Sequence, residues 1–276
     1  AQLFGQYNKR YIYYLGSNAI IEKEYYQAID ILSTLIAVDT ISEDAYFLRA
    51  VAKYNLNDVV GAERDFTQAL RINPVFVQAY QYRAITRSFM GNYQDALEDF
   101  QRAIDIRPDY LNTYFSRGVT YFLSQQFESA IKDFDRYLRR YPEEPDALLN
   151  RGTAYLMMKD TTRAFEDYNQ AVAVAPHNSQ VYLRRGSVYS MQGEEEKAIA
   201  DFDKSIFYDA KNIGAYFSRA VSYARSNKPL QAIADLTMVT HLDSLNSLAY
   251  FNRALLYSQI GDYNKSLDDY DRVAEY

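Results

Sequence analysis

Residues 43–76 read EDAYFLRAVAKYNLNDVVGAERDFTQALRINPVF, and they contain two sets of apolar residues at helical spacing. Tyr46 and Ala50 lie four positions apart, which places them on one face of a helix. The same spacing returns at Ala62 and Phe66, and a proline near the end of the stretch stops the second helix. This stretch therefore predicts two short amphipathic helices.

The same pattern recurs every 34 residues along the chain of 276 residues. A fixed period of this length indicates a solenoid, in which each unit buries its apolar face by stacking on its neighbours. The repeats start near residues 9, 43, 77, 111, 145, 179, 213 and 247. We therefore expect one all-α array over residues 1–276, without a separate domain or linker.

Small residues at the helix crossings, aromatic residues one turn away and prolines at the unit ends resemble the tetratricopeptide repeat. Ala50, Gly118 and Pro108 are examples of these positions. The resemblance, to bacterial members of the family, covers nearly the whole chain. It implies a right-handed superhelical solenoid of about eight helix-turn-helix repeats. The departures are local, at Thr40, Ala210 and Ser244 for the terminal proline, Leu236 for an aromatic residue and Ser266 for an alanine.

Composition restricts the class of protein. A net charge of −6 and a pI near 5.1 argue against nucleic-acid binding, which requires a concentrated basic surface. No apolar run is long enough to span a bilayer, and the absence of cysteine excludes disulfides. The opening Ala-Gln-Leu resembles the end left by a signal peptidase, which favours an extracytoplasmic (periplasmic) location over a cytoplasmic one.

The C-terminal end of the array has no polar cap. Leu267, Tyr270 and Val273 lie on the face that a following unit would cover. Solenoids require a polar outer face at their ends. We therefore expect that the chain is part of a longer protein, or that this face contacts a partner or another copy of the chain.

Arginines and aspartates recur together, with each aspartate 16 residues after its arginine. The first repeat has Leu15 and Ile31 at these two places, so both residue types change together. This covariation predicts ion pairs within a repeat; pairing with the neighbouring repeat would leave Asp269 without a partner in the chain. We expect a structural role for the pairs, and the alternative is a basic stripe that binds phosphate or acidic peptides. The pairs are Arg49 and Asp65, Arg83 and Asp99, Arg117 and Asp133, Arg151 and Asp167, Arg185 and Asp201, Arg219 and Asp235, and Arg253 and Asp269.

The resemblance also implies a concave surface lined by the first helix of each repeat. Its lining is largely apolar, which suits a peptide or partner protein whose apolar side chains lodge between successive helices. The competing interpretation is that some of these residues pack against the next repeat. Asn150 and Arg184 offer a weaker hypothesis, a site for one carboxylate. The expected groove residues are Phe47, Tyr54, Phe89, Phe115, Phe122, Leu149, Met157, Leu183, Phe217 and Phe251.

No motif for catalysis, a cofactor or a metal is evident. The two histidines, His177 and His241, have no ligand partner at a suitable spacing, and no glycine-rich phosphate loop occurs. Two functions follow. The first is a non-enzymatic protein–protein interaction scaffold. The alternative is a structural, spacer or sensor segment of a larger protein whose activity lies outside this chain.

Overall fold

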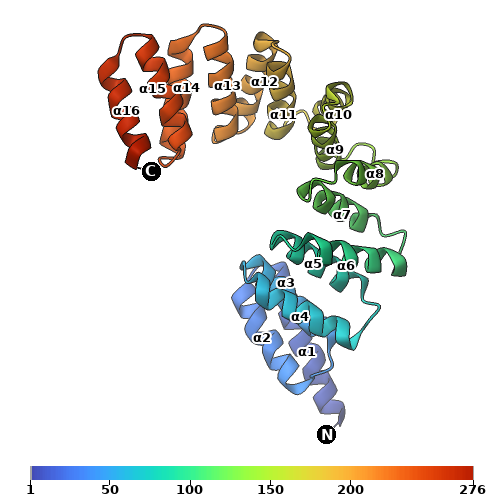
Figure 1. The fold of residues 1–276 in the computed structure, drawn as a ribbon. Helices are drawn as coiled ribbons and strands as arrows, with labels where there is room; N and C mark the ends of the chain where they lie inside the picture. Colours follow the sequence, from blue (N-terminus) through green and yellow to red (C-terminus); the bar gives the residue numbers. More distant parts are fainter. Residues whose placement is uncertain (1, 276) are drawn as a thin grey trace. The chain divides into compact units, whose positions relative to one another are not determined.

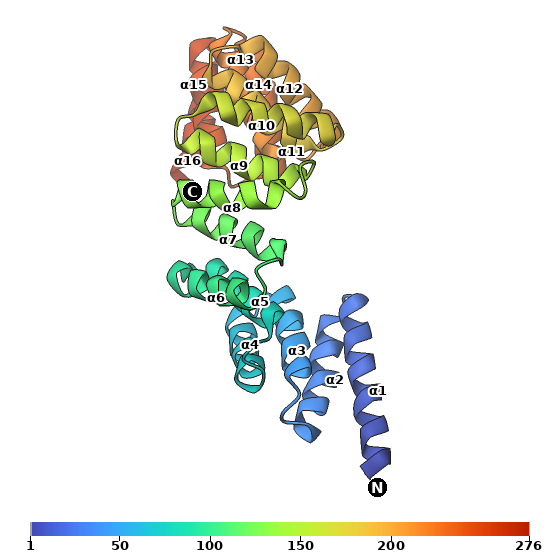
Figure 2. The same cartoon turned by 90° about the vertical axis from the view of Figure 1, so that its right-hand side faces the viewer.

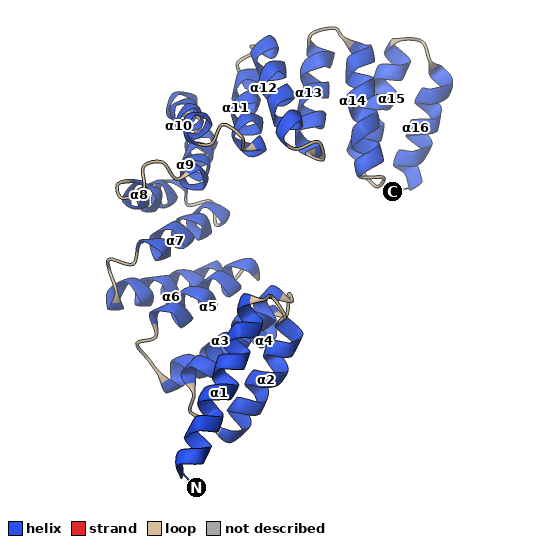
Figure 3. Cartoon of the chain, turned by 180° about the vertical axis from the view of Figure 1, so that it is seen from behind, coloured by secondary structure: helices blue, strands red, loops and turns tan. Residues whose placement is uncertain are grey.

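The computed structural model describes the backbone of residues 2–275 and the side chains of residues 8–275. This part of the chain forms 16 α-helices and no strand (Figures 1 and 3). The first eight helices are α1 (Gln2–Ile21), α2 (Tyr25–Val38), α3 (Glu43–Asn55), α4 (Val59–Ile72), α5 (Val77–Phe89), α6 (Tyr93–Ile106), α7 (Leu111–Leu123) and α8 (Phe127–Leu138). The next eight are α9 (Pro145–Met157), α10 (Thr161–Val174), α11 (Ser179–Met191), α12 (Glu195–Tyr208), α13 (Ile213–Arg225), α14 (Pro229–Leu242), α15 (Ser247–Gln259) and α16 (Tyr263–Glu275).

The helix ends follow from local chemistry. Ser42 caps α3 by accepting a hydrogen bond from the backbone N–H of Ala45, and Glu43 and Asp44 lie in its first turn, where the helix dipole favours negative charge. Prolines open α9 and α14, where a missing N–H is tolerated. One boundary differs from the sequence expectation, because α1 begins at Gln2 instead of near Lys9.

The turn inside each repeat has the same backbone geometry. One residue per turn has a positive φ, and these residues are spaced by the repeat period. Three are glycines, which adopt this conformation without a steric penalty. Each hairpin therefore reverses direction in the same way, through Lys23, Asn57, Gly91, Gln125, Lys159, Gly193, Asn227 and Gly261.

The chain divides into two compact units, Ala1–Arg140 and Tyr141–Tyr276, each with four hairpins. Within a unit, a first helix packs against its own second helix and against the second helix of the preceding repeat. First helices also pack against each other, α1 with α3, α3 with α5 and α5 with α7, and likewise α9 with α11 and α11 with α13. Figure 2 shows the order of these helices. We call the side of each unit formed by its first helices the first-helix face.

In most hairpins the core is an aromatic ring packed against a small residue, and leucines, Leu32 and Leu236, take the place of the ring in α2 and α14. In α7 and α8, a Cβ atom added to Gly118 would lie 2.8 Å from the ring of Phe134, so the two helices approach as closely as a glycine permits. Ala50 and Phe66 occupy the corresponding places in α3 and α4, and both are fully buried. The period of small and aromatic residues thus sets how the two helices dock.

Candidate interaction face

The arginine at the middle of each first helix from α3 onward forms an ion pair with the aspartate of its own second helix. In Arg185, Nε donates to Asp201 Oδ2 and Nη2 donates to Oδ1, both at 2.7 Å. The same two-pronged geometry joins Arg49 to Asp65, Arg83 to Asp99, Arg117 to Asp133, Arg151 to Asp167, Arg219 to Asp235 and Arg253 to Asp269. This pairing is the one within a repeat and not the one between repeats.

The third nitrogen of the guanidinium, Nη1, donates a hydrogen bond to a residue of the preceding repeat. This contact was not predicted from the sequence. Nη1 of Arg185 donates to Asn169 Oδ1 at 3.0 Å, and Asn169 lies on α10. A usable signal was present, because a polar residue stands 16 positions before each arginine. One side chain therefore ties three helices together, and the other examples are Arg49 with Ser33, Arg83 with Thr67, Arg117 with Gln101, Arg219 with Asp203 and Arg253 with Thr237.

Tyrosine rings flank the guanidinium groups. Arg117 lies 5.3 Å from the ring centroid of Tyr114 and 5.6 Å from that of Tyr121. Hydrogen bonds to Asp201 raise the pKa of Arg185 above its ordinary value, against an opposing effect of desolvation. These arginines are half-buried and use their donors inside the array, which favours the structural role over a basic stripe.

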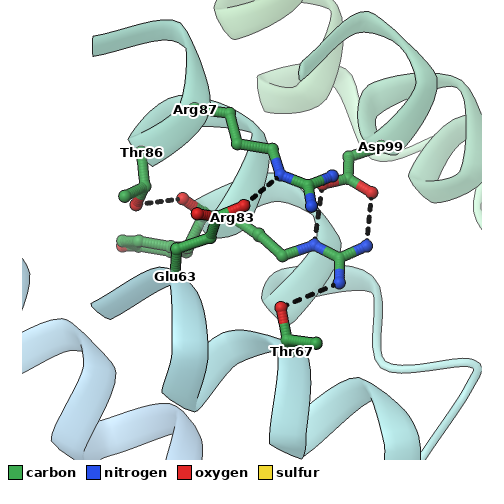
Figure 4. A network of polar contacts seen from close by, with 7 residues as sticks. Glu63, Thr67, Arg83, Thr86, Arg87 and Asp99 are labelled. Atoms are coloured by element: carbon green, nitrogen blue, oxygen red, sulfur yellow. Dashed lines mark hydrogen bonds and ion pairs between the residues drawn. The ribbon is translucent and has the colours of Figure 1, made fainter. Parts of the chain in front are cut away.

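A wider polar network joins the second and third repeats of the first unit. In Figure 4, Arg83 and Arg87 point toward the same carboxylate, that of Asp99. Arg87 also donates to Glu63 at 2.7 Å, and Arg83 donates to Thr67 at 3.2 Å. Two cations and two carboxylates therefore balance in this junction, so none of them is an uncompensated charge.

The first-helix face of the first unit contains an open pocket between α3, α5 and α7. Its volume is about 280 Å³. The pocket brings together three of the expected groove residues, Tyr54, Phe89 and Phe115. Thr120 Oγ1 donates to Ser88 Oγ at 3.0 Å at its polar edge. The complete lining is Tyr54, Ile85, Ser88, Phe89, Phe115, Ser116, Val119, Thr120 and Leu123.

Two other expected groove residues of this unit lie outside that lining. Phe47 packs against Phe66 and Tyr82, with ring centroids 5.7 and 5.5 Å away. Phe122 stacks edge-on against Phe127 of its own repeat, at 5.5 Å. Both rings contact the chain's own aromatic residues.

The second unit has two smaller pockets on its first-helix face. One, of about 210 Å³, contains Leu149 together with Asn150 and Arg184, so the proposed carboxylate-binding pair shares a pocket. The other, of about 220 Å³, lies between α13, α14 and α15.

The remaining expected groove residues of this unit are placed differently. Met157 is exposed, and Leu183 lies beside Gly214. Phe217 packs against the core. Phe251 stacks against Tyr270, with ring centroids 6.0 Å apart.

Among the residues that the structure describes, no helix is both long and apolar enough to cross a membrane. The described histidine and carboxylate side chains also form no group of three with the arrangement of a metal site.

The paired helices at a fixed period define an α-helical repeat protein. Residues 115–175 and 149–212 match a family described as tetratricopeptide repeat, as do residues 248–276, and residues 90–125 match one described as TPR repeat. These matches together span more than half of the chain, which therefore belongs to the tetratricopeptide repeat family. Protein binding is typical of this family. A search of curated proteins found no match.

Solved structures share the fold. A tetratricopeptide repeat protein from Parabacteroides merdae is 16% identical with a TM-score of 0.72, covering 94% of this chain and 98% of its own. The C-terminal part of a TPR repeat-containing protein from Cytophaga hutchinsonii is 21% identical with a TM-score of 0.63, covering 86% and 97%. YrrB, described as a TPR protein with an unusual peptide-binding site, is 20% identical with a TM-score of 0.51, covering 67% and 95%.

Proposed function

We propose that the chain is a non-enzymatic scaffold that binds an extended or helical peptide of a partner protein on its first-helix face. The observation that carries this proposal is the apolar pocket between α3, α5 and α7. Phe89 and Leu123 are exposed there, with 66% and 49% of their surfaces accessible. Contiguous exposed apolar surface of this kind usually marks a binding site.

The size of the pocket supports a side chain as its occupant. An engineered apolar cavity of about 150 Å³ holds a benzene molecule. The α3–α7 pocket, at about 280 Å³, has room for one large side chain of a peptide. Its walls are aromatic and aliphatic, and such pockets hold the residues that contribute most to binding. The peptide-binding site attributed to YrrB is a further, fold-level argument for this class of ligand.

The proposal is tested by selecting ligands from a display library of short random peptides with the intact chain. A selected peptide is then titrated against the Phe89→Ser, Leu123→Ser double variant. We expect its affinity to fall by at least tenfold, or about 1.4 kcal/mol. Both side chains are exposed, so the fold should tolerate the change.

The matched control replaces apolar residues of the same unit that do not line the pocket. Val60 and Val75 are also more than half exposed, but they lie on or beside α4. The Val60→Ser, Val75→Ser variant should bind the peptide as the unchanged chain does. Equal losses in both variants would rule out the first-helix face as the specific site.

A further inference from the structure

The junction of α13, α14 and α15 has smaller side chains where the junction of α3, α4 and α5 has aromatic ones. In the earlier junction, four rings pack around Ala50, with Phe66 and Tyr82 at 6.0 Å between centroids. One is Phe47, whose equivalent in the later junction is also a phenylalanine, Phe217. The other three belong to Tyr54, Phe66 and Tyr82. Five repeats later, the same places hold Ala224, Leu236 and Asn252.

The loss of these rings leaves an open pocket of about 220 Å³. Its floor reaches the core, because Ala220 and Leu236 are 1% and 2% exposed. Val221 and Leu255 form its walls, and both point from first helices. The pocket therefore opens on the first-helix face of the second unit.

The chemistry of the matching junction indicates what fits this pocket. There, the chain's own Phe66 and Tyr82 fill the space against walls of the same kind, an alanine and a valine among them. A cavity of about 150 Å³ is sufficient for a benzene ring. An aromatic side chain of a partner thus has both the shape and the surroundings that the chain itself uses elsewhere.

A positive charge beside the pocket adds a second requirement. Arg225 stands where the earlier junction has Asn55, and 56% of its side chain is exposed. Its Nη1 donates to the backbone oxygen and the Oγ of Ser190, at 3.2 and 3.1 Å, and forms an ion pair with Glu195 Oε1 at 3.4 Å. Among the described residues, its Nε and Nη2 groups make no hydrogen bond, so they are available to a carboxylate of a ligand.

We propose that the α13–α15 pocket binds an aromatic side chain of the peptide partner, with an adjacent carboxylate held by Arg225. This inference rests on the proposed function, since it specifies the peptide that the scaffold binds. Aromatic–acidic sequences are therefore preferred over aliphatic or basic ones at this pocket.

The test uses a small probe with both features, 3-phenylpropionate, titrated into the full chain with isotope-labelled methyl groups. We expect saturable shifts of the methyl signals of Val221, Leu236 and Leu255. The alcohol 3-phenylpropan-1-ol lacks the charge and should bind about tenfold more weakly. Propionate lacks the ring and should cause no saturable shift.

Two variants fill the pocket with the residues that the earlier junction uses. Leu236→Phe restores the ring of Phe66 from α14, and Ala224→Tyr restores that of Tyr54 from α13. Either change should abolish the saturable shifts while the circular dichroism spectrum stays unchanged. Arg225→Gln should weaken 3-phenylpropionate about tenfold and leave the alcohol unaffected.

The inference is overturned if 3-phenylpropionate causes no saturable shift, or if its shifts persist when either filling variant folds. It is also overturned if Arg225→Gln weakens the alcohol and the acid equally. The α3–α7 pocket is tested separately by the Phe89 and Leu123 changes. Peptide binding that depends on those residues, without any probe binding here, would remove this inference and leave the proposed function intact.

Discussion

Arg185 shows what one residue does in each repeat. Its guanidinium bonds Asp201 of the same repeat and Asn169 of the preceding one, so its position depends on two other helices. The covariation of arginine and aspartate predicted the first contact. The second contact has a signal in the sequence, the polar residue 16 positions before each arginine, but other polar positions recur with the same period, and only the structure shows which of them the guanidinium reaches.

Removal of one member of the pair should be more destabilising than removal of both. Arg185→Ala leaves Asp201, whose side chain is 6% exposed, without its cation, and we expect a loss of about 3 kcal/mol in the free energy of unfolding. Arg185→Leu with Asp201→Leu replaces the pair by apolar groups and should lose less. Urea unfolding of the three proteins measures this; equal losses would show that the pair does not act as a unit.

Tyr168 makes stability depend on pH in the alkaline range. Burial raises the pKa of its hydroxyl above the ordinary value of 10.0, although the hydrogen bond with Thr153 opposes the shift. The folded state thus holds this proton more tightly than the unfolded state. The stabilisation is complete below about pH 10 and is lost as pH rises through the folded pKa.

Tyr168→Phe should therefore reduce the fall of the melting temperature above about pH 10. Phenylalanine occupies the same place in other repeats, at Phe134 and Phe202, and Thr153 keeps its bond to the Leu149 carbonyl at 2.7 Å. Melting temperatures of both proteins over a pH series provide the measurement. Parallel curves for the two proteins would contradict this account.

At the scale of the helices, the sequence predicted boundaries well where capping residues and prolines are present. The first helix of the quoted stretch was expected to start at Glu43, and α3 starts there. The depth of the pockets was not predictable from the sequence, because it depends on the rotamer that each aromatic side chain adopts. Phe122 is at a groove position by periodicity, but its ring lies against Phe127 and outside the α3–α7 pocket.

Asn212 illustrates a cap that also joins helices. Its Oδ1 accepts from the backbone N–H of Ala215 at the start of α13. Its Nδ2 donates to Ser179 of α11 at 2.8 Å and to Ser205 of α12 at 3.2 Å. The residue is 7% exposed, so these bonds are shielded from water.

Asn212→Ala should lose about 2 kcal/mol, of which the cap and the buried hydrogen bonds each contribute about half. The matched control is Asn246→Ala, one repeat later. Asn246 caps α15 through Ala249 in the same way, but among the described residues its Nδ2 donates only to Asp243 of its own turn. We expect a loss of about 1 kcal/mol there. Chemical denaturation compares them, and a larger loss for Asn246 would contradict the three-helix role of Asn212.

At the scale of the whole molecule, the repeats place apolar side chains on the first-helix face of each unit. The chain as a whole carries a net charge of −6, yet the α3–α7 pocket is lined by uncharged residues. Its ligand is therefore expected to bind there mainly by apolar burial. Affinity at this pocket should change little with salt, because screening acts on charged contacts.

The salt dependence provides a test at this scale. Titration of a selected peptide at low and high sodium chloride should give affinities within about threefold for the first unit. A steep decrease of the affinity with increasing salt concentration would show that charged residues outside the pocket dominate the binding.

Peptide binding at the first-helix face is tested most directly by methyl chemical-shift mapping of the intact chain with a selected peptide. The largest shifts are expected at Ile85, Val119 and Leu123, which line the pocket between α3, α5 and α7. Shifts confined to Val60 and Val75, which lie outside the pocket lining, would contradict binding at this face.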